Sequence, residues 1–112
     1  MSVGKNIKHY RKLSCLKQIE LAEILNISDV FMGYIEQGRK KPSIELLIAI
    51  STALKIPMSY LIADTHKDNK VYYSGINSDF LHSLTDNELK KLVAYLKVTF
   101  EYFHFDTTER PL

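Results

Sequence analysis

The sequence predicts an all-α protein, and three observations lead to this prediction. First, apolar residues recur at helical spacing in five short segments within the first sixty or so residues, and residues that favour turns separate these segments. Second, Thr85 and Glu88 form a Ser/Thr-x-x-Glu capping box directly before a longer apolar run with the same spacing. Third, the five segments leave no strand pattern of comparable quality. We therefore expect five helices followed by C-terminal helices.

The first two predicted helices cover residues 4–13 and 18–25. The second is expected to end at Asn26, because asparagine tolerates the left-handed conformation that terminates many helices. The side chains expected to face inward are Ile7, Tyr10 and Arg11 from the first helix, and Leu21, Ala22 and Leu25 from the second.

Three further helices are predicted over residues 29–37, 44–54 and 57–62. Ser28 and Ser43 precede the first two of these, and serine is a preferred N-cap residue because its hydroxyl accepts a hydrogen bond from the first helical turn. The inward-facing stripes are expected to consist of Phe31, Met32 and Ile35, and of Leu47, Ile50 and Leu54. Leu46 and Ile48 lie outside the second stripe and are a candidate contact patch.

The organisation changes after residue 63. Residues 64–78 lose the helical periodicity and gain polar residues, so they are expected to be a linker. Residues 79–106 are expected to be a helical segment that ends in a helix of about 19 residues, and residues 107–112 a frayed tail. The apolar stripe of this helix of about 19 residues consists of Leu89, Leu92, Val93, Leu96, Phe100 and Phe103. The helix has further apolar residues outside this stripe, namely Tyr95, Val98 and Tyr102.

Charge divides along the same boundary. Residues 1–63 contain nine Lys and Arg against five Asp and Glu, a net charge of +4, whereas residues 64–112 contain six against eight, a net charge of −2. Opposite signs in two segments indicate two roles, and the basic segment is the one suited to a polyanionic partner.

Composition excludes several classes of protein. The 112 residues have an ordinary globular mixture of apolar and charged residues, so we expect neither a disordered chain nor a membrane span. The single cysteine, Cys15, and the scattered histidines form no metal-ligand spacing, so no metal and no other cofactor is expected. Because no nucleophile–base pair, carboxylate pair or phosphate-binding glycine loop stands out, we do not expect an enzyme.

About half of the chain carries an ordered set of positions, namely Ile7, Arg11, Leu16, Gln18, Leu21, Ala22, Ile27, Ser28, Ile35, Glu36, Gly38, Pro42, Ser43, Leu47, Ile50, Ala53, Leu54 and Leu61. This set resembles the Cro/repressor (lambda-repressor-like, XRE) helix-turn-helix family of phage and bacterial transcription regulators. Two positions depart from the family pattern, because Lys17 replaces the usual Ser or Thr N-cap and Cys15 replaces a glycine of the first turn.

The resemblance implies a five-helix DNA-binding domain over residues 1–63, with the third helix in the DNA major groove. It implies base contacts by Asp29, Val30, Gly33 and Tyr34, and an ion pair between Arg11 and Glu36 that fixes the third helix. Contacts to DNA phosphates are expected from Lys17, Gln18, Ser28, Gln37, Arg39, Lys40 and Lys41.

The C-terminal helix has more apolar surface than one contact face requires, so we expect it to form a homodimer. The expected interface consists of Leu89, Leu92, Val93, Tyr95, Leu96, Phe100, Tyr102 and Phe103. Two alternatives remain: the helix packs on its own domain through a single face, or the dimer forms through the fourth and fifth helices.

Together these features predict a cytoplasmic, sequence-specific transcription regulator, most simply a repressor that binds a palindromic operator in double-stranded DNA as a homodimer. By analogy with related repressors, a protein antagonist would bind the C-terminal helices. The alternative is an antitoxin or another protein-interaction module whose C-terminal helices bind a protein partner.

Overall fold

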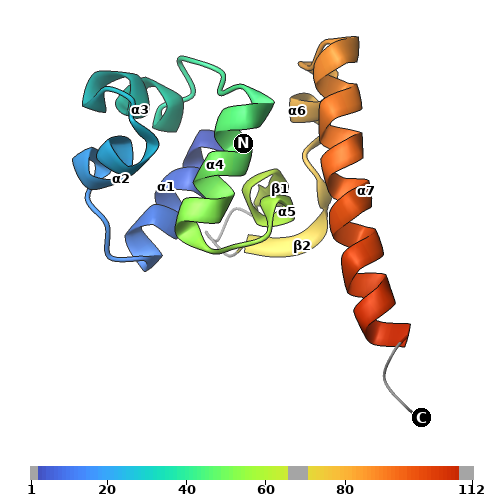
Figure 1. Ribbon diagram of the computed structural model, residues 1–112. Coiled ribbons are helices and arrows are strands. Elements are labelled where there is room, and N and C mark those ends of the chain that lie inside the picture. The colour runs from blue at the N-terminus through green and yellow to red at the C-terminus, as the bar shows by residue number, and fades with distance from the viewer. Residues whose placement is uncertain (1–2, 66–70, 109–112) are drawn as a thin grey trace.

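A computed structural model describes residues 3–65 and 71–108, and it places the side chains of residues 3–64 and 77–97. The expected all-α class is confirmed, with a five-helix N-terminal body followed by C-terminal helices (Figure 1). The helices of the body are α1 (Val3–Leu13), α2 (Gln18–Leu25), α3 (Asp29–Glu36), α4 (Ile44–Leu54) and α5 (Met58–Leu61).

One shared hydrophobic core holds the five helices together. Most of the side chains expected to face inward are buried in it, although Tyr10, Leu25 and Phe31 are only half-buried at its edge. Leu46 and Ile48, the candidate contact patch, are also half-buried against this core. The largest fully buried apolar side chains are Ile7, Leu21, Met32, Ile35, Ile44, Leu47, Ile50, Leu61 and Ile62, together with Leu92 from the C-terminal part of the chain.

The helix ends follow from local chemistry. The hydroxyls of Ser28 and Ser43 accept hydrogen bonds from the backbone N–H groups of Phe31 and Leu46, as expected of N-cap residues. Asn26 has a φ of 58° and terminates α2 in the left-handed conformation. Cys15, in the turn between α1 and α2, has the same positive φ, a conformation that glycine adopts more readily than cysteine.

The segment expected to be an irregular linker instead contains two strands. Strand β1 (Ala63–Thr65) pairs antiparallel with strand β2 (Val71–Ile76), and Ala63 lies opposite Ile76. The run Val71-Tyr72-Tyr73 accounts for the second strand, because β-branched and aromatic residues favour extended backbone. The pair of strands directs the chain from α5 back along the body.

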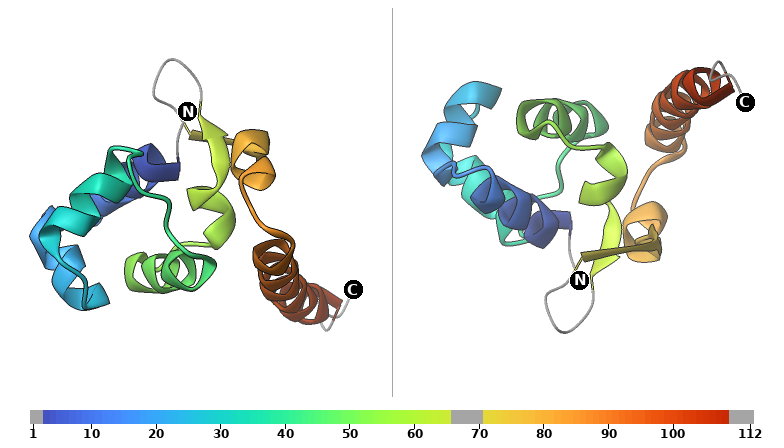
Figure 2. Two further views of the ribbon diagram at one scale, coloured as in Figure 1. Left: turned by 90° about the horizontal axis from the view of Figure 1, so that it is seen from above. Right: turned by 90° about the horizontal axis from the view of Figure 1, so that it is seen from below.

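Two helices follow, α6 (Ser78–His82) and α7 (Asp86–Thr108). The predicted capping box is present, since the Thr85 N–H donates to the Glu88 carboxylate at 2.9 Å and the Glu88 N–H donates to the Thr85 hydroxyl at 3.1 Å. Both helices lie on the side of the body opposite α2 and α3 (Figure 2). The first half of α7 packs on α4, and its second half extends past the body (Figure 1).

Candidate nucleic-acid interface

Helix α3 lies on the surface of the body with one side exposed. Met32 and Ile35 anchor its inner side in the core. On its outer side Asp29, Val30 and Gln37 are exposed, and the side chain of Val30 is 64% accessible. An apolar side chain this exposed contributes little to folding, so it is available to a partner molecule.

A buried ion pair holds α3 in place. The Arg11 Nε lies 2.6 Å from one Glu36 carboxylate oxygen, and its Nη2 donates to the other at 3.0 Å. Arg11 also donates to the carbonyl of Leu16 at 2.8 Å, and the Gln18 amide donates to Glu36 at 3.2 Å. The predicted Arg11–Glu36 pair is therefore present, and it joins α1, the start of α2 and α3. Removing one partner of such a buried pair typically costs about 3–5 kcal/mol.

Gly33 does not face outward as predicted. It is buried, and a Cβ built at this position would lie 3.4 Å from the Gln18 side-chain oxygen. The start of α2 crosses α3 here, so the Gln18 side chain covers the glycine. A direct base contact by Gly33 is thus an incorrect prediction, and Gln18 takes its place beside the exposed residues of α3.

Tyr34 and Arg39 form a second ordered part of this surface. The guanidinium carbon of Arg39 lies 5.0 Å from the centre of the Tyr34 ring, within the range of a cation–π contact. Tyr34 is half-buried and Arg39 is exposed. The contact holds a cation directly beside an aromatic side chain at the C-terminal end of α3.

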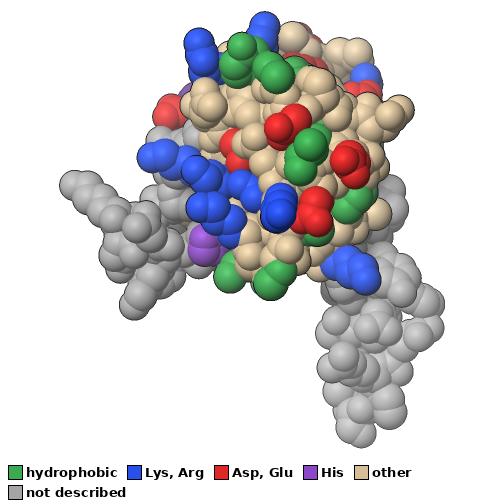
Figure 3. Space-filling model, turned by 90° about the vertical axis from the view of Figure 1, so that its left-hand side faces the viewer, with side chains coloured by type: hydrophobic (Ala, Val, Ile, Leu, Met, Phe, Trp, Pro, Cys, Tyr) green, Lys and Arg blue, Asp and Glu red, His purple; other side chains and the backbone are tan. Residues whose placement is uncertain are grey.

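Exposed cations lie just after α3 and just before α2. Lys17, just before α2, and Arg39 and Lys40, just after α3, are exposed, as is the N-cap residue Ser28. The face that carries α2 and α3 has lysine and arginine side chains interspersed with acidic and hydrophobic ones (Figure 3).

The backbone N–H of Lys17 donates to the Glu20 carboxylate at 2.7 Å, which stabilises the start of α2 where the usual N-cap hydroxyl is missing.

Lys41 differs from its two neighbours. Its ammonium donates to the Ser83 carbonyl at 2.5 Å and to the Glu88 carboxylate at 3.0 Å. The predicted phosphate contact by Lys41 is therefore not available while the ammonium is paired, because acceptors from α6 and α7 bind this cation. No sequence pattern links Lys41 to residues more than forty positions away.

The sequence reasoning missed two residues that position α1. A Cβ added to Gly4 would lie 2.2 Å from the Ile35 carbonyl oxygen, so α1 meets the backbone of α3 where only glycine fits. Asn6 is buried, and its amide donates to the carbonyls of Leu61 and Ala63 at 2.8 Å each. The sequence does contain a signal for both positions, because a small residue (Gly4) and a polar residue (Asn6) lie on the inward side of the first helix.

The predicted dimer interface on α7 divides into two parts. Leu92 is 1% exposed and Tyr95 and Leu96 are half-buried, all against the core of the same chain. Leu92 was therefore wrongly predicted to lie in an interface with a second copy, because α4 already covers it. Leu89 and Val93 are 40% and 53% exposed, whereas the side chains of Phe100, Tyr102 and Phe103 lie outside the described residues.

Two ion pairs fix the first half of α7. Lys91 lies 2.6 Å from Glu45 of α4, one turn along α7 from the Lys41–Glu88 contact. The hydrogen bond from Lys91 lowers the pKa of Glu45, and the same bond raises the pKa of Lys91. The backbone N–H of Thr85 and then the Lys41 ammonium lower the pKa of Glu88.

The described residues contain neither a metal-binding cluster nor a helix that could span a membrane. No group of three or more His, Cys, Asp or Glu side chains in that part of the chain is arranged to hold a metal ion. Of the helices described, none has the length and the apolar character needed to cross a membrane.

Residues 7–61 match the family model HTH_3: Helix-turn-helix, and the chain belongs to this family of Cro/repressor-type domains. The immunity repressor protein of Bacillus phage phi105 is 39% identical over 64 residues, which are 57% of this chain and 44% of the repressor. The chain spans less than half the length of the curated relatives that it matches.

Solved structures extend the comparison. The P22 c2 repressor, crystallised in complex with a synthetic operator, is 30% identical with a TM-score of 0.51, over 55% of this chain and 92% of that one. The SinR protein/SinI protein complex has a TM-score of 0.54 at 23% identity, over 88% of this chain and 98% of that one. The second comparison concerns the fold alone.

Proposed function

We propose that this chain is a sequence-specific DNA-binding regulator of transcription that places α3 in the DNA major groove. The observation that carries the proposal is the exposed side of α3, which is followed by the exposed cations Arg39 and Lys40 and is fixed from beneath by the Arg11–Glu36 pair. An α-helix fits the major groove of B-DNA, where side chains can distinguish the base pairs. The proposal assigns the chain no catalytic activity.

Each exposed residue of α3 has a role in this proposal. Val30 contacts a thymine methyl group, Tyr34 makes apolar and hydroxyl contacts, and Asp29 accepts a hydrogen bond from a cytosine amino group. The residues that contact phosphates or border them are Lys17, Gln18, Ser28, Gln37, Arg39 and Lys40. Such contacts orient the protein without reading the sequence.

Two substitutions separate these roles. Tyr34→Ala should reduce the affinity for a selected duplex much more than for a random one, because it removes a base contact together with the support of Arg39. Lys40→Ala should weaken both duplexes alike and reduce the slope of log affinity against log salt by about 0.9. Titrations of both duplexes at two salt concentrations measure this. Identical effects of the two variants would contradict the assignment of α3 as the recognition helix.

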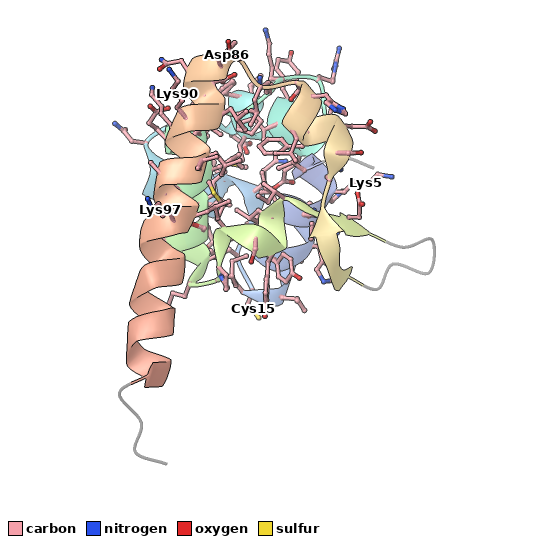
Figure 4. The ribbon with its side chains drawn as sticks, turned by 90° about the vertical axis from the view of Figure 1, so that its right-hand side faces the viewer. Lys5, Cys15, Asp86, Lys90 and Lys97 are labelled. Atoms are coloured by element: carbon pink, nitrogen blue, oxygen red, sulfur yellow. The ribbon has the colours of Figure 1, made fainter. Side chains whose placement is uncertain are left out.

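We also propose that two copies bind together, as a repressor on a palindromic operator with half-sites about 34 Å apart. Two features of α7 support this proposal. Leu89 and Val93 are exposed in its first half, and its second half extends past the body (Figure 4). The same face is where we place any protein antagonist, which would compete with the second copy. Acting on operator DNA, such a regulator works in the cytoplasm.

The dimer proposal predicts that Leu89→Glu/Val93→Glu converts the protein to a monomer in sedimentation, because two carboxylates would lose solvation at the contact. Ala94→Glu is a matched control, since Ala94 is exposed and points about 100° away from Val93 around the helix. A dimer that survives the double substitution would place the interface elsewhere, with α4 and α5 the remaining candidates.

A further inference from the structure

One cation of the DNA-facing body is bound by the C-terminal segment. Of the three consecutive cations Arg39, Lys40 and Lys41, the last reaches away from α3 to the Ser83 carbonyl and to the Glu88 carboxylate. Helix α7 begins beside the end of the α3–α4 loop, on the side of the body opposite α3 (Figures 1 and 2).

The acceptors of this cation are well fixed. Glu88 belongs to the capping box of α7, where its carboxylate also accepts from the Thr85 N–H at 2.9 Å. Ser83 ends α6, and its carbonyl is the second acceptor. Both acceptors are therefore in place whenever α7 is docked, and the Lys41 ammonium requires no rearrangement of α7 to reach them.

The contact is nevertheless open to competition. The side chains of Lys41 and Glu88 are 39% and 26% exposed, so another anion can approach the ammonium from solvent. Leu92 and the neighbouring Lys91–Glu45 pair dock α7 independently of Lys41. Lys41 can thus exchange partners without the whole of α7 leaving the body.

We propose that the docked start of α7 acts as an intramolecular brake on DNA binding, because Glu88 competes with DNA phosphate for Lys41. A lysine that is paired with a carboxylate neutralises no DNA phosphate and releases no condensed counterion, so it adds nothing to the salt dependence of binding. A protein partner that lifts the start of α7 releases Lys41 and raises the affinity for DNA. This inference rests on the proposed function, and it adds a regulatory input to it.

Glu88→Gln tests the brake, because glutamine keeps an acceptor for the Thr85 N–H and removes the charge that holds Lys41. Glu45→Gln is the matched control, since it removes the same charge from the neighbouring ion pair without involving a DNA-facing cation. In titrations of the full chain with duplex DNA from 50 to 200 mM salt, Glu88→Gln should raise the affinity roughly three- to tenfold and steepen the salt slope by about 0.9 per subunit. Glu45→Gln should match wild type in slope.

A third variant assigns the gain to Lys41. Adding Lys41→Gln to Glu88→Gln should abolish the gain in affinity and restore the wild-type slope. Equal slopes for Glu88→Gln and Glu45→Gln, or a gain that persists without Lys41, would overturn the brake while leaving the proposed function intact. Absence of DNA binding by wild type and by all variants would overturn both.

Discussion

At the scale of single residues, the exposed side of α3 depends on contacts made beneath it. The Arg11–Glu36 pair could be predicted because the resemblance to repressor domains covers both positions. The burial of Gly33 could not be predicted in this way. Helical periodicity places this residue on the outside of α3 and does not reveal that Gln18 of α2 lies across it. Periodicity assigns a residue to a side of one helix, whereas burial depends on the neighbouring helix.

Two glycines provide a prediction at this scale. Gly33→Ala should raise the free energy of unfolding by about 0.5–1 kcal/mol, because alanine favours helix and the added methyl only touches Gln18. Gly4→Ala should lower it by about 1–3 kcal/mol, because the methyl would overlap the Ile35 carbonyl. Urea denaturation of both variants measures the difference, and a change of the same sign at both positions would contradict this account of α1 and α3.

At the scale of helices and strands, the five helices of the body and the start of α7 follow from their caps and apolar spacing. The pairing of β1 and β2 was not predicted from the sequence, because both strands are short and the polar residues near them are typical of a linker. The docking of α7 was equally hidden, since Lys41–Glu88 and Glu45–Lys91 join residues that are 47 and 46 positions apart. Such pairs emerge only once the helices are placed in space.

The docking of α7 should depend on pH. The Lys91 hydrogen bond lowers the pKa of Glu45 below its ordinary 4.5, and the Thr85 N–H and then Lys41 lower that of Glu88. The stabilisation from both carboxylates is therefore complete above pH 4.5 and is lost as the pH falls through the lowered pKa values. The pKa of Lys91 is raised, so the pH dependence has the opposite sign. The stabilisation from Lys91 is complete below pH 10.5 and is lost as the pH rises through its higher pKa in the folded chain.

We therefore expect the amide protection of α7, measured by hydrogen exchange and corrected for intrinsic rates, to fall below pH 4.5 while α4 remains protected. The double variant Glu45→Gln/Glu88→Gln should show weaker protection at neutral pH and little further loss in acid. Protection of α7 that stays constant down to pH 3 in wild type would contradict a role for the two ion pairs.

At the scale of the whole molecule, the division of charge acquires a structural meaning. In the part of the chain that the structure describes, the first half of α7 packs against the basic body, and two ion pairs join Lys41 and Glu45 of the body to Glu88 and Lys91 of α7. The division of charge predicted two roles, but it did not predict which residues of the two segments meet. The structure brings the start of α7 to the loop that follows α3.

The central claim is that α3 reads DNA sequence, and selection of duplexes from a random library by the full chain tests it most directly. The account predicts enrichment of a palindromic motif whose half-sites are centred about 34 Å apart. It further predicts that Tyr34→Ala degrades the motif while Lys40→Ala preserves it at lower affinity. Recovery of the random library without an enriched motif, or an identical motif with Tyr34→Ala, would contradict the claim.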